Sequence, residues 1–258
     1  MKVQEIKKTK SGKYRIKLDN QTILTYDDVI LKNSLLYKKE IDVSIYEQMI
    51  QDHLYYDAYN KTLSYILKRN RCTKEIEKYL DKFSISKEDK IKIITHLKDI
   101  GLLNDQNYVK AYISDSIYLK NEGPLKIKDS LLALNISNEL IDSELNKIDT
   151  ELIKEKAEKI ISKKVKSNHK YSEYQLRNKI TLEMVNLGYS KELVNTILEN
   201  YNYDDSYLLG KEYQRLYLKL SKKFSGYELS NKIKQKLYSK GFNVNEISEI
   251  ISKKEDEF

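Results

Sequence analysis

The sequence predicts a mainly α-helical protein, built from tandem three-helix repeats that form an elongated curved array, with a small β-rich cap at the N-terminus. Three observations predict this class. The 258 residues include only 7 Gly and 1 Pro, so residues that interrupt helices are scarce. Pairs of apolar residues four apart recur along the chain, as one face of a helix requires. Strand-like runs are confined to the first 44 residues.

The N-terminal part, residues 1–44, is expected to be a small β-rich domain. Short runs of β-branched and aromatic residues at Val3–Ile6, Tyr14–Leu18 and Thr22–Thr25 predict a three-stranded meander. Asp27 and Asp28 then predict the cap and first turn of a short helix, and a second short helix is expected from near Ser44. Three such strands bury little surface, so this part should pack on the helices that come after it in the chain.

An internal repeat organises the remainder of the chain. Ile76, Ile127, Ile180 and Ile233 are 51, 53 and 53 residues apart, and three further apolar positions keep the same offsets in each repeat. The first two positions lie four residues apart on one helix face, and the third falls in a turn. The three further sets are Leu80, Leu131, Met184 and Leu237; Ile85, Ile136, Tyr189 and Phe242; and Ile94, Leu145, Leu198 and Ile251.

The turn chemistry repeats with the apolar positions. A residue that caps helix N-termini follows the third anchor in every repeat, and glycine precedes it in two repeats, where a helix end would need positive φ. Two serines have the spacing of a capping box at the start of the preceding helix. The capping residues are Ser86, Ser137, Ser190 and Asn243, the glycines are Gly188 and Gly241, and the capping-box pairs are Ser172 with Gln175 and Ser225 with Glu228.

A longer amphipathic stretch precedes each of these helix pairs, so each unit is expected to contain a long, a medium and a short helix. Such units stack mainly on their neighbours, which predicts a solenoid-like array. The long stretches are Ile45–Arg69, Asp105–Asn121, Glu151–Lys166 and Asp204–Phe224, and the expected helical units span residues 45–103, 104–150, 151–203 and 204–258.

The sequence offers no pattern typical of an enzyme. Cys72 is the single cysteine, the three histidines lie far apart, and no glycine-rich phosphate loop is present. We therefore expect no enzyme activity, no cofactor and no bound metal. The charged N-terminal residues and the absence of a long apolar window predict a cytoplasmic protein without a membrane span.

The net charge of +8 favours a polyanionic partner, and the basic residues gather at the C-terminal ends of the long helices. One interpretation is ordinary complementarity between cations and helix C-termini. The other is a broken stripe of positive charge along one edge of the array, which would bind a phosphate backbone or an acidic protein groove, with Tyr65, Tyr171 and Tyr174 either stacking on bases or packing in the core. The candidate residues are Lys68, Arg69, Arg71, Lys120, Lys163, Lys164, Lys166, Lys222 and Lys223.

Three short motifs within the repeat resemble the RecX family, the regulators of the bacterial recombinase RecA. The stretch from Ala58 to Ile76 is similar to the family signature, with Arg69 and Arg71 in its Arg-x-Arg-Ser element, although Cys72 replaces the usual Ser and Ile76 the usual Leu. Leu97, the run 101–105 and Tyr108-Val109 resemble a second block, and Gly123 with the run 127–131 resembles a third. The resemblance is strongest over residues 55–145.

The resemblance implies a protein that binds the RecA–DNA filament along its helical groove and restrains strand exchange, ATP hydrolysis and co-protease activity during DNA repair and the SOS response. It implies no cofactor and supplies no catalytic residue. The expected partners are the RecA filament and single- or double-stranded DNA, the latter bound weakly when alone, with the chain itself a monomer. Two alternatives stay open: a helical-repeat protein that binds nucleic acid directly, and a protein-interaction scaffold with an unfilled apolar or aromatic groove.

Overall fold

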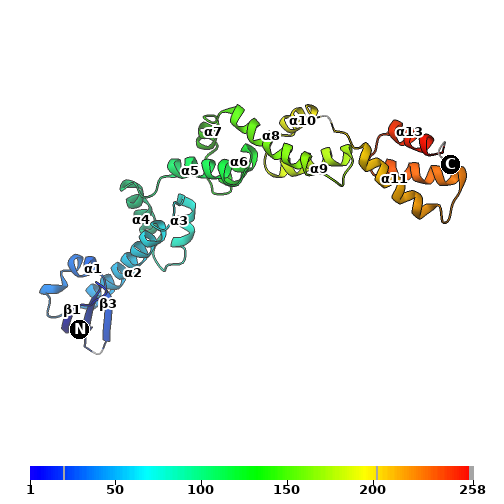
Figure 1. The fold of residues 1–258 in the computed structure, drawn as a ribbon. Coiled ribbons are helices and arrows are strands. Elements are labelled where there is room, and N and C mark those ends of the chain that lie inside the picture. Colours follow the sequence, from blue (N-terminus) through cyan, green and yellow to red (C-terminus); the bar gives the residue numbers. More distant parts are fainter. Residues whose placement is uncertain (20, 202, 256–258) are drawn as a thin grey trace. The chain divides into compact units, whose positions relative to one another are not determined.

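The computed structural model describes residues 1–19, 21–201 and 203–255, and the side chains of all of these except 254 and 255. In this part of the chain thirteen α-helices follow one three-stranded antiparallel sheet (Figure 1), which confirms the mainly α class with a β-rich N-terminal part. The chain forms two compact units. The first comprises Met1–Ala111 with Ala133–Ile136, and the second comprises Tyr112–Leu132 with Ser137–Phe258.

The N-terminal sheet contains the three predicted strands in the order β1-β2-β3. Strand β1 spans Val3–Lys8, β2 spans Tyr14–Leu18 and β3 spans Gln21–Thr25. Alternation along β2 buries Ile16 and Leu18 on one face of the sheet, because successive side chains of a strand point to opposite sides.

Three further elements cover the inner face of this sheet. Helix α1 (Asp27–Lys32), the 3₁₀ turn η1 (Leu35–Tyr37) and the start of α2 (Val43–Ile66) enclose a core around Ile16 and Met49. The short helix expected from near Ser44 is wrong, since α2 runs without a break for 24 residues. The helix expected from near Ser44 and the long helix expected from Ile45 share one continuous apolar face. They therefore form a single helix.

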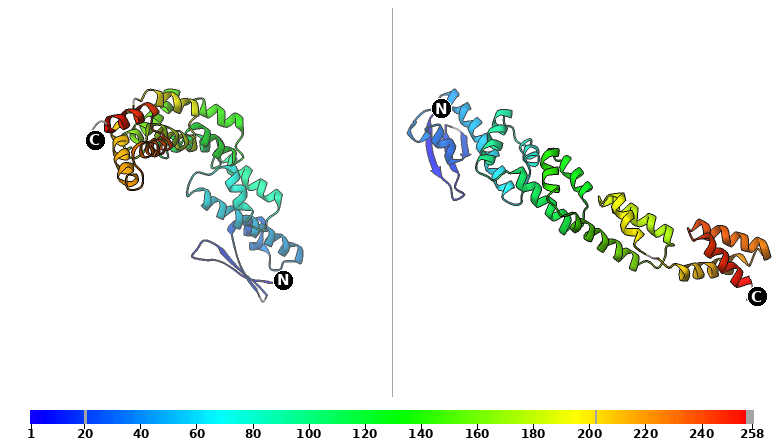
Figure 2. Two further views of the ribbon diagram at one scale, coloured as in Figure 1. Left: turned by 90° about the vertical axis from the view of Figure 1, so that its right-hand side faces the viewer. Right: turned by 90° about the horizontal axis from the view of Figure 1, so that it is seen from above.

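The helices from α2 onward form four triplets in chain order, and we call the second helix of each triplet the medium helix. The expected order of a long, a medium and a short helix holds in the last three triplets and is wrong in the first, where α3 (Thr73–Leu80) has 8 residues and α4 (Lys87–Asp99) has 13. Figure 2 shows the last three, α11 to α13, lying together, and these three also contact one another pairwise. The division of the chain into four repeat units stays a prediction. The helices are α3 Thr73–Leu80, α4 Lys87–Asp99, α5 Asp105–Tyr118, α6 Pro124–Leu132, α7 Asn138–Leu145, α8 Thr150–Lys166, α9 Glu173–Asn186, α10 Lys191–Glu199, α11 Ser206–Leu220, α12 Gly226–Ser239 and α13 Val244–Glu255.

The first two sets of repeated apolar anchors are buried as the spacing predicted. The first two anchors of every repeat are at most 1% exposed and lie on the medium helices α3, α6, α9 and α12. The third anchor falls in the turn after the medium helix in each case. The fourth is buried in the last two repeats, whereas Ile93 and Ile141 take that place in the core of the first two.

Most of the predicted helix caps are also formed, but the one expected at Asp27 is wrong, because Tyr26 holds the N-cap position of α1. Ser86, Ser137 and Ser190 accept hydrogen bonds from backbone amides three residues later, and Asn243 accepts one from the amide of Asn245. Gly188 and Gly241 adopt φ of 90° and 79°, and Asn135 takes the equivalent position with φ of 56°. Ser172 caps α9, whereas Ser225 makes no side-chain cap at the start of α12.

Within the described residues, no helix combines the length and the apolar character that crossing a membrane would require.

Candidate functional site

Five of the nine predicted basic residues are exposed lysines for which the described part of the chain provides no ion pair. They lie directly after α2, in the last turns of α8 and directly after α11. Each has its ammonium group in solvent, so binding an anion there would not require breaking an internal salt bridge. These lysines are Lys68, Lys163, Lys166, Lys222 and Lys223.

Arg69 and Arg71 are held by the fold. Both pair with Glu75, at N–O distances of 2.5 Å and 3.2 Å, and Arg71 is only 7% exposed. The Arg71 guanidinium also lies 3.4 Å from the centre of the Tyr65 ring, and its Nε donates to the Tyr65 carbonyl. Because this guanidinium is enclosed by its own helix junction, we exclude Arg71 from the candidate interface. Arg69 remains accessible on one side.

Lys120 and Lys164 are also engaged. Lys164 pairs with Glu183 on α9, so it links two helices of the same unit. The Lys120 ammonium lies 4.6 Å from the centre of the Tyr112 ring and 3.9 Å from a carboxylate oxygen of Glu122. Both cations contribute to local structure as well as to surface charge.

Unpaired lysines gather at the C-terminal end of α8. Here Lys159, Ser162, Lys163, Lys166 and Ser167 line a hollow of about 430 Å³. Lysine ammonium groups and serine hydroxyls are ligands for phosphate oxygens. The three lysines exceed what one helix C-terminus needs to offset its partial negative charge, which is about half an elementary charge. The chemistry of this hollow suits an anion.

The tyrosines near these cations differ in exposure. Tyr65 stacks on Tyr79 at a centroid distance of 4.0 Å and packs against the core that includes Ile76, and Tyr171 accepts from Lys179. Tyr174 is 64% exposed, so its ring is open to solvent. Of the three predicted aromatic residues, Tyr174 is therefore the most accessible to a partner.

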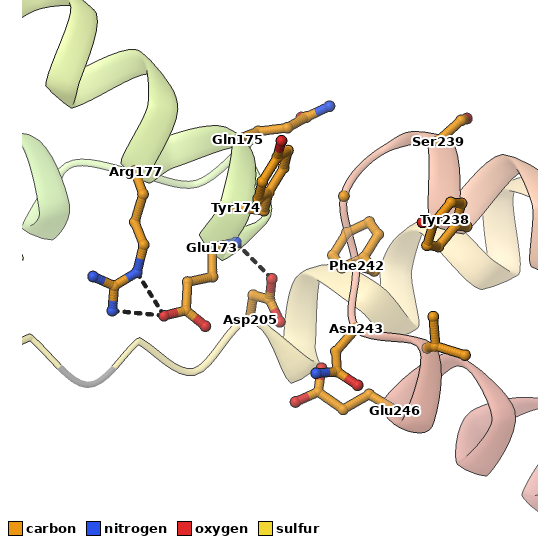
Figure 3. A pocket seen from close by; sticks show the side chains of 12 residues that line it. Glu173, Tyr174, Gln175, Arg177, Asp205, Tyr238, Ser239, Phe242, Asn243 and Glu246 are labelled. Carbon is orange, nitrogen blue, oxygen red and sulfur yellow. Dashed lines mark hydrogen bonds and ion pairs between the residues drawn. The ribbon is translucent and has the colours of Figure 1, made fainter. Parts of the chain in front are cut away.

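A second feature, which the sequence did not indicate, is a cavity of about 630 Å³ beside the turn that follows α12. Figure 3 shows the rings of Tyr174, Tyr238 and Phe242 around one side, and the carboxyl groups of Glu173, Asp205 and Glu246 along the other. The three carboxylates and Arg177 give the lining a net charge of −2 (three negative, one positive), in a chain whose net charge is +8.

The carboxylates of this cavity are only partly neutralised. Arg177 pairs with Glu173 and also donates hydrogen bonds to the carbonyls of Leu198 and Tyr201. Burial raises the pKa of Asp205, the hydrogen bond from the Glu173 amide opposes this, and the negative charges of Glu173 and Asp204 add to the increase. Burial also raises the pKa of Glu246, with Asp205 and Glu173 adding to the effect. A cavity of this kind is complementary to a cation and not to phosphate.

An equivalent cavity of about 420 Å³ lies one repeat earlier, beside the turn that follows α9. Its lining is mainly apolar, with Leu125, Ile153, Tyr189 and Leu193 among the residues. Leu193 and Glu246 are each three residues after the capping residue of the short helix, so the same place in the repeat carries an apolar group in one cavity and a carboxylate in the other.

A repeated acidic cap was the one sequence signal that could have located the first cavity. Asp105 accepts a hydrogen bond from the amide of Thr73, and Asp205 accepts one from the amide of Glu173, at the same sequence separation of 32 residues. In each case the aspartate at the start of a long helix caps the preceding medium helix. In the described residues, no group of three or more His, Cys, Asp or Glu side chains could hold a metal ion.

Comparisons with known proteins identify relatives that align along nearly the whole chain. The chain is 32% identical over 254 residues to the regulatory protein RecX of Streptococcus equi subsp. zooepidemicus, an alignment that covers 96% of this chain and 97% of that protein. It is 30% identical over 259 residues to the regulatory protein RecX of Streptococcus uberis, covering 98% and 99% of the two chains. No protein-family model matches the sequence.

Two solved structures share the fold. A crystal structure of a regulatory protein RecX superimposes with a TM-score of 0.64 at 23% identity, covering 77% of this chain and 99% of that one. The crystal structure of RecX from Lactobacillus salivarius superimposes with a TM-score of 0.53 at 27% identity, covering 57% and 95%.

Proposed function

The chain belongs to the family of RecX regulatory proteins, and on that premise we propose that it modulates the RecA recombinase as an inhibitor. It would bind along the groove of the RecA–DNA filament and restrain strand exchange, ATP hydrolysis and co-protease activity in DNA repair. The observation that carries the proposal is identity of about one third with RecX proteins over nearly the whole chain, 32% in the first case. The relatives are named as regulators, and contact rather than catalysis is the activity we infer.

The unpaired lysines at the helix ends support a role for charge in this contact. Lys68, the pair Lys163 and Lys166, and the pair Lys222 and Lys223 are exposed and free of ion pairs in the described chain. In the proposed complex they would face the DNA backbone or acidic surfaces of the recombinase, where charge-assisted contacts steer association and weaken with salt. The continuity of these groups as one stripe stays a prediction.

A charge-reversal experiment tests the proposal. Lys163→Glu combined with Lys166→Glu should weaken inhibition of RecA-dependent ATP hydrolysis, because both side chains are exposed and neither holds the fold. Lys164 is left unchanged, since it pairs with Glu183. Lys191→Glu with Lys211→Glu is the matched control: these exposed residues lie on α10 and α11, and the change in net charge is identical.

The outcomes separate the possible functions. A wild-type chain without effect on the recombinase would exclude the proposed function. Inhibition that is equal in both double variants and insensitive to salt would show that the basic helix ends do not contribute to inhibition. Tight binding to bare nucleic acid without any effect on the filament would favour the alternative of a direct nucleic-acid-binding repeat protein.

A further inference from the structure

The outer face of the N-terminal sheet carries two cross-strand rows of exposed residues. The pairing places Lys7 opposite Arg15 and Arg15 opposite Leu24, in one row across all three strands. The next row joins Glu5, Lys17 and Thr22. All six side chains are exposed, whereas the other face of the sheet packs on α1, η1 and α2.

Protection of the sheet edges does not account for these cations. Charged residues that prevent edge-to-edge association are needed on edge strands, where backbone groups are unpaired. Arg15 and Lys17 lie on β2, the central strand, which pairs with β1 on one side and β3 on the other. A positive charge here does nothing to shield an exposed backbone.

The arrangement is also unfavourable for the isolated domain. Lys7 and Arg15 are directly opposite each other, and like charges in that position destabilise a sheet. No ion pair within 4 Å joins any of Lys7, Arg15 and Lys17 to a carboxylate in the described chain, and this includes Glu5, which faces Lys17. An external anion would remove this repulsion.

We propose that the outer face of the N-terminal sheet binds the phosphate backbone of single-stranded DNA through Lys7, Arg15 and Lys17. Side chains two apart on one strand project from the same face about 6.6 Å apart, and neighbouring strands add cations about 4.8 Å away. The three cations thus form a compact triangle on an open surface. Leu24 lies in the same row and is 44% exposed, which offers an apolar contact for a sugar or a base.

A single strand is the form of DNA that this surface fits. A flexible strand can lie across a flat sheet, as it does on other sheet surfaces that bind single-stranded nucleic acid. A duplex is read by elements that enter its grooves, and these three strands present no such element on their outer face. With no aromatic ring in the two rows, binding should be weak, independent of base sequence and strongly dependent on salt. The choice of DNA as the anion rests on the proposed function.

The test measures binding of the full chain to a fluorescent single-stranded oligonucleotide by anisotropy, in the absence of recombinase. Arg15→Gln combined with Lys17→Gln should weaken binding about tenfold at low salt, and should lower the slope of log K against log salt by about 0.7 for each lost phosphate contact. Arg15→Glu with Lys17→Glu should abolish binding. Circular dichroism of both variants verifies that the sheet is retained.

Lys87→Glu with Lys98→Glu is the matched control for the Glu variant, since both exposed lysines lie on α4 of the same unit and the net charge falls equally, from +8 to +4. This control should retain binding. Wild-type affinity and salt slope in the folded Gln variant, or equal affinity of the wild-type chain for duplex DNA, would overturn the inference. Because no recombinase is present, these outcomes are independent of the inhibition assay that decides the proposed function.

Discussion

Two equivalent joints between successive helix triplets are built from different chemistry. In the earlier joint, the turn after α9 meets the start of α6 through main-chain atoms: the amide of Gly123 donates to the Leu187 carbonyl at 2.6 Å, and that of Leu125 to the Gly188 carbonyl at 3.0 Å. In the later joint, the turn after α12 meets the start of α9 through a side chain, with the Ser172 hydroxyl donating to the Lys240 carbonyl at 2.7 Å.

The sequence explains why the two joints differ. Pro124 is the first residue of α6 and has no amide hydrogen, so the aspartate cap that Asp205 supplies to the amide of Glu173 is impossible there. Gly123 and Gly188 instead allow the two backbones to touch. Where two backbones touch, there is no room for a side chain at either contacting residue. Where side chains form the contact, they can shift to accommodate a substitution. The comparison predicts unequal sensitivity to substitution.

The largest effect is expected in the backbone joint. An added Cβ at Gly188 would lie 2.4 Å from the Lys126 backbone nitrogen, and the residue has φ of +90°. Gly188→Ala should therefore lower the free energy of unfolding by about 3–5 kcal/mol, as the sum of overpacking and left-handed backbone strain. Urea titration followed by circular dichroism measures this change.

Gly101→Ala is the control for backbone strain alone. Gly101 has φ of +73°, but an added Cβ would meet nothing within 4 Å. Its substitution should cost only about 1–2 kcal/mol. An equal loss in the two variants would contradict the role of close contact at Gly188.

A smaller effect is expected at the equivalent glycine of the side-chain joint. A Cβ at Gly241 would lie 2.9 Å from a ring carbon of Tyr174 and 3.0 Å from the Ser172 hydroxyl oxygen, both of them side-chain atoms, and Tyr174 is 64% exposed. Gly241→Ala should then lower the free energy of unfolding by about 1–3 kcal/mol, from φ and a small shift of these side chains. A loss as large as that of Gly188→Ala would remove the distinction between the joints.

A third prediction concerns the hydroxyl that connects the side-chain joint. Ser172 is 1% exposed, donates to the Lys240 carbonyl and accepts from the Gln175 amide. Ser172→Ala should destabilise the chain by about 1 kcal/mol through loss of the cap. Hydrogen exchange should show faster opening of the amides in the turn after α12, and Ser137→Ala, an exposed cap elsewhere, should leave that turn unchanged.

The smallest expected effect is the pH dependence that Asp205 contributes at the side-chain joint. Burial raises the pKa of Asp205, and Glu173 and Asp204 add to it, so the folded chain holds this proton more tightly than the unfolded chain. Stability from this group is then greatest below the ordinary value of 3.8 and is lost as pH rises through the raised pKa. Glu246 acts in the same direction.

Asp205→Asn tests this sign, because an asparagine oxygen can still accept from the Glu173 amide while carrying no charge. The unfolding free energy of the wild-type chain minus that of the variant should increase as the pH is lowered from neutrality. A difference that decreases on acidification would show that the ionised carboxylate stabilises the joint.

Much of the fold followed from local rules. Ile76 and Leu80, with their counterparts in the other repeats, are buried because residues four apart share a helix face. Ser86, Ser137 and Ser190 cap helices because a hydroxyl satisfies amides that no helix can pair itself. The sequence located the candidate cations in the same way, because each lies at the C-terminal end of an expected long helix. The number of these residues and their positive charge follow from the composition.

What each cation does was decided only in three dimensions. Arg69, Arg71 and Lys68 are close together in sequence, yet Arg71 is enclosed by Tyr65 and Glu75, Arg69 is paired, and Lys68 is free. The carboxylates beside the turn after α12 come from three helix starts far apart in the chain. Local sequence determines the periodicity of a helix, because that depends on neighbours within one turn. Which charges are neutralised depends on residues that only packing brings within a few ångströms.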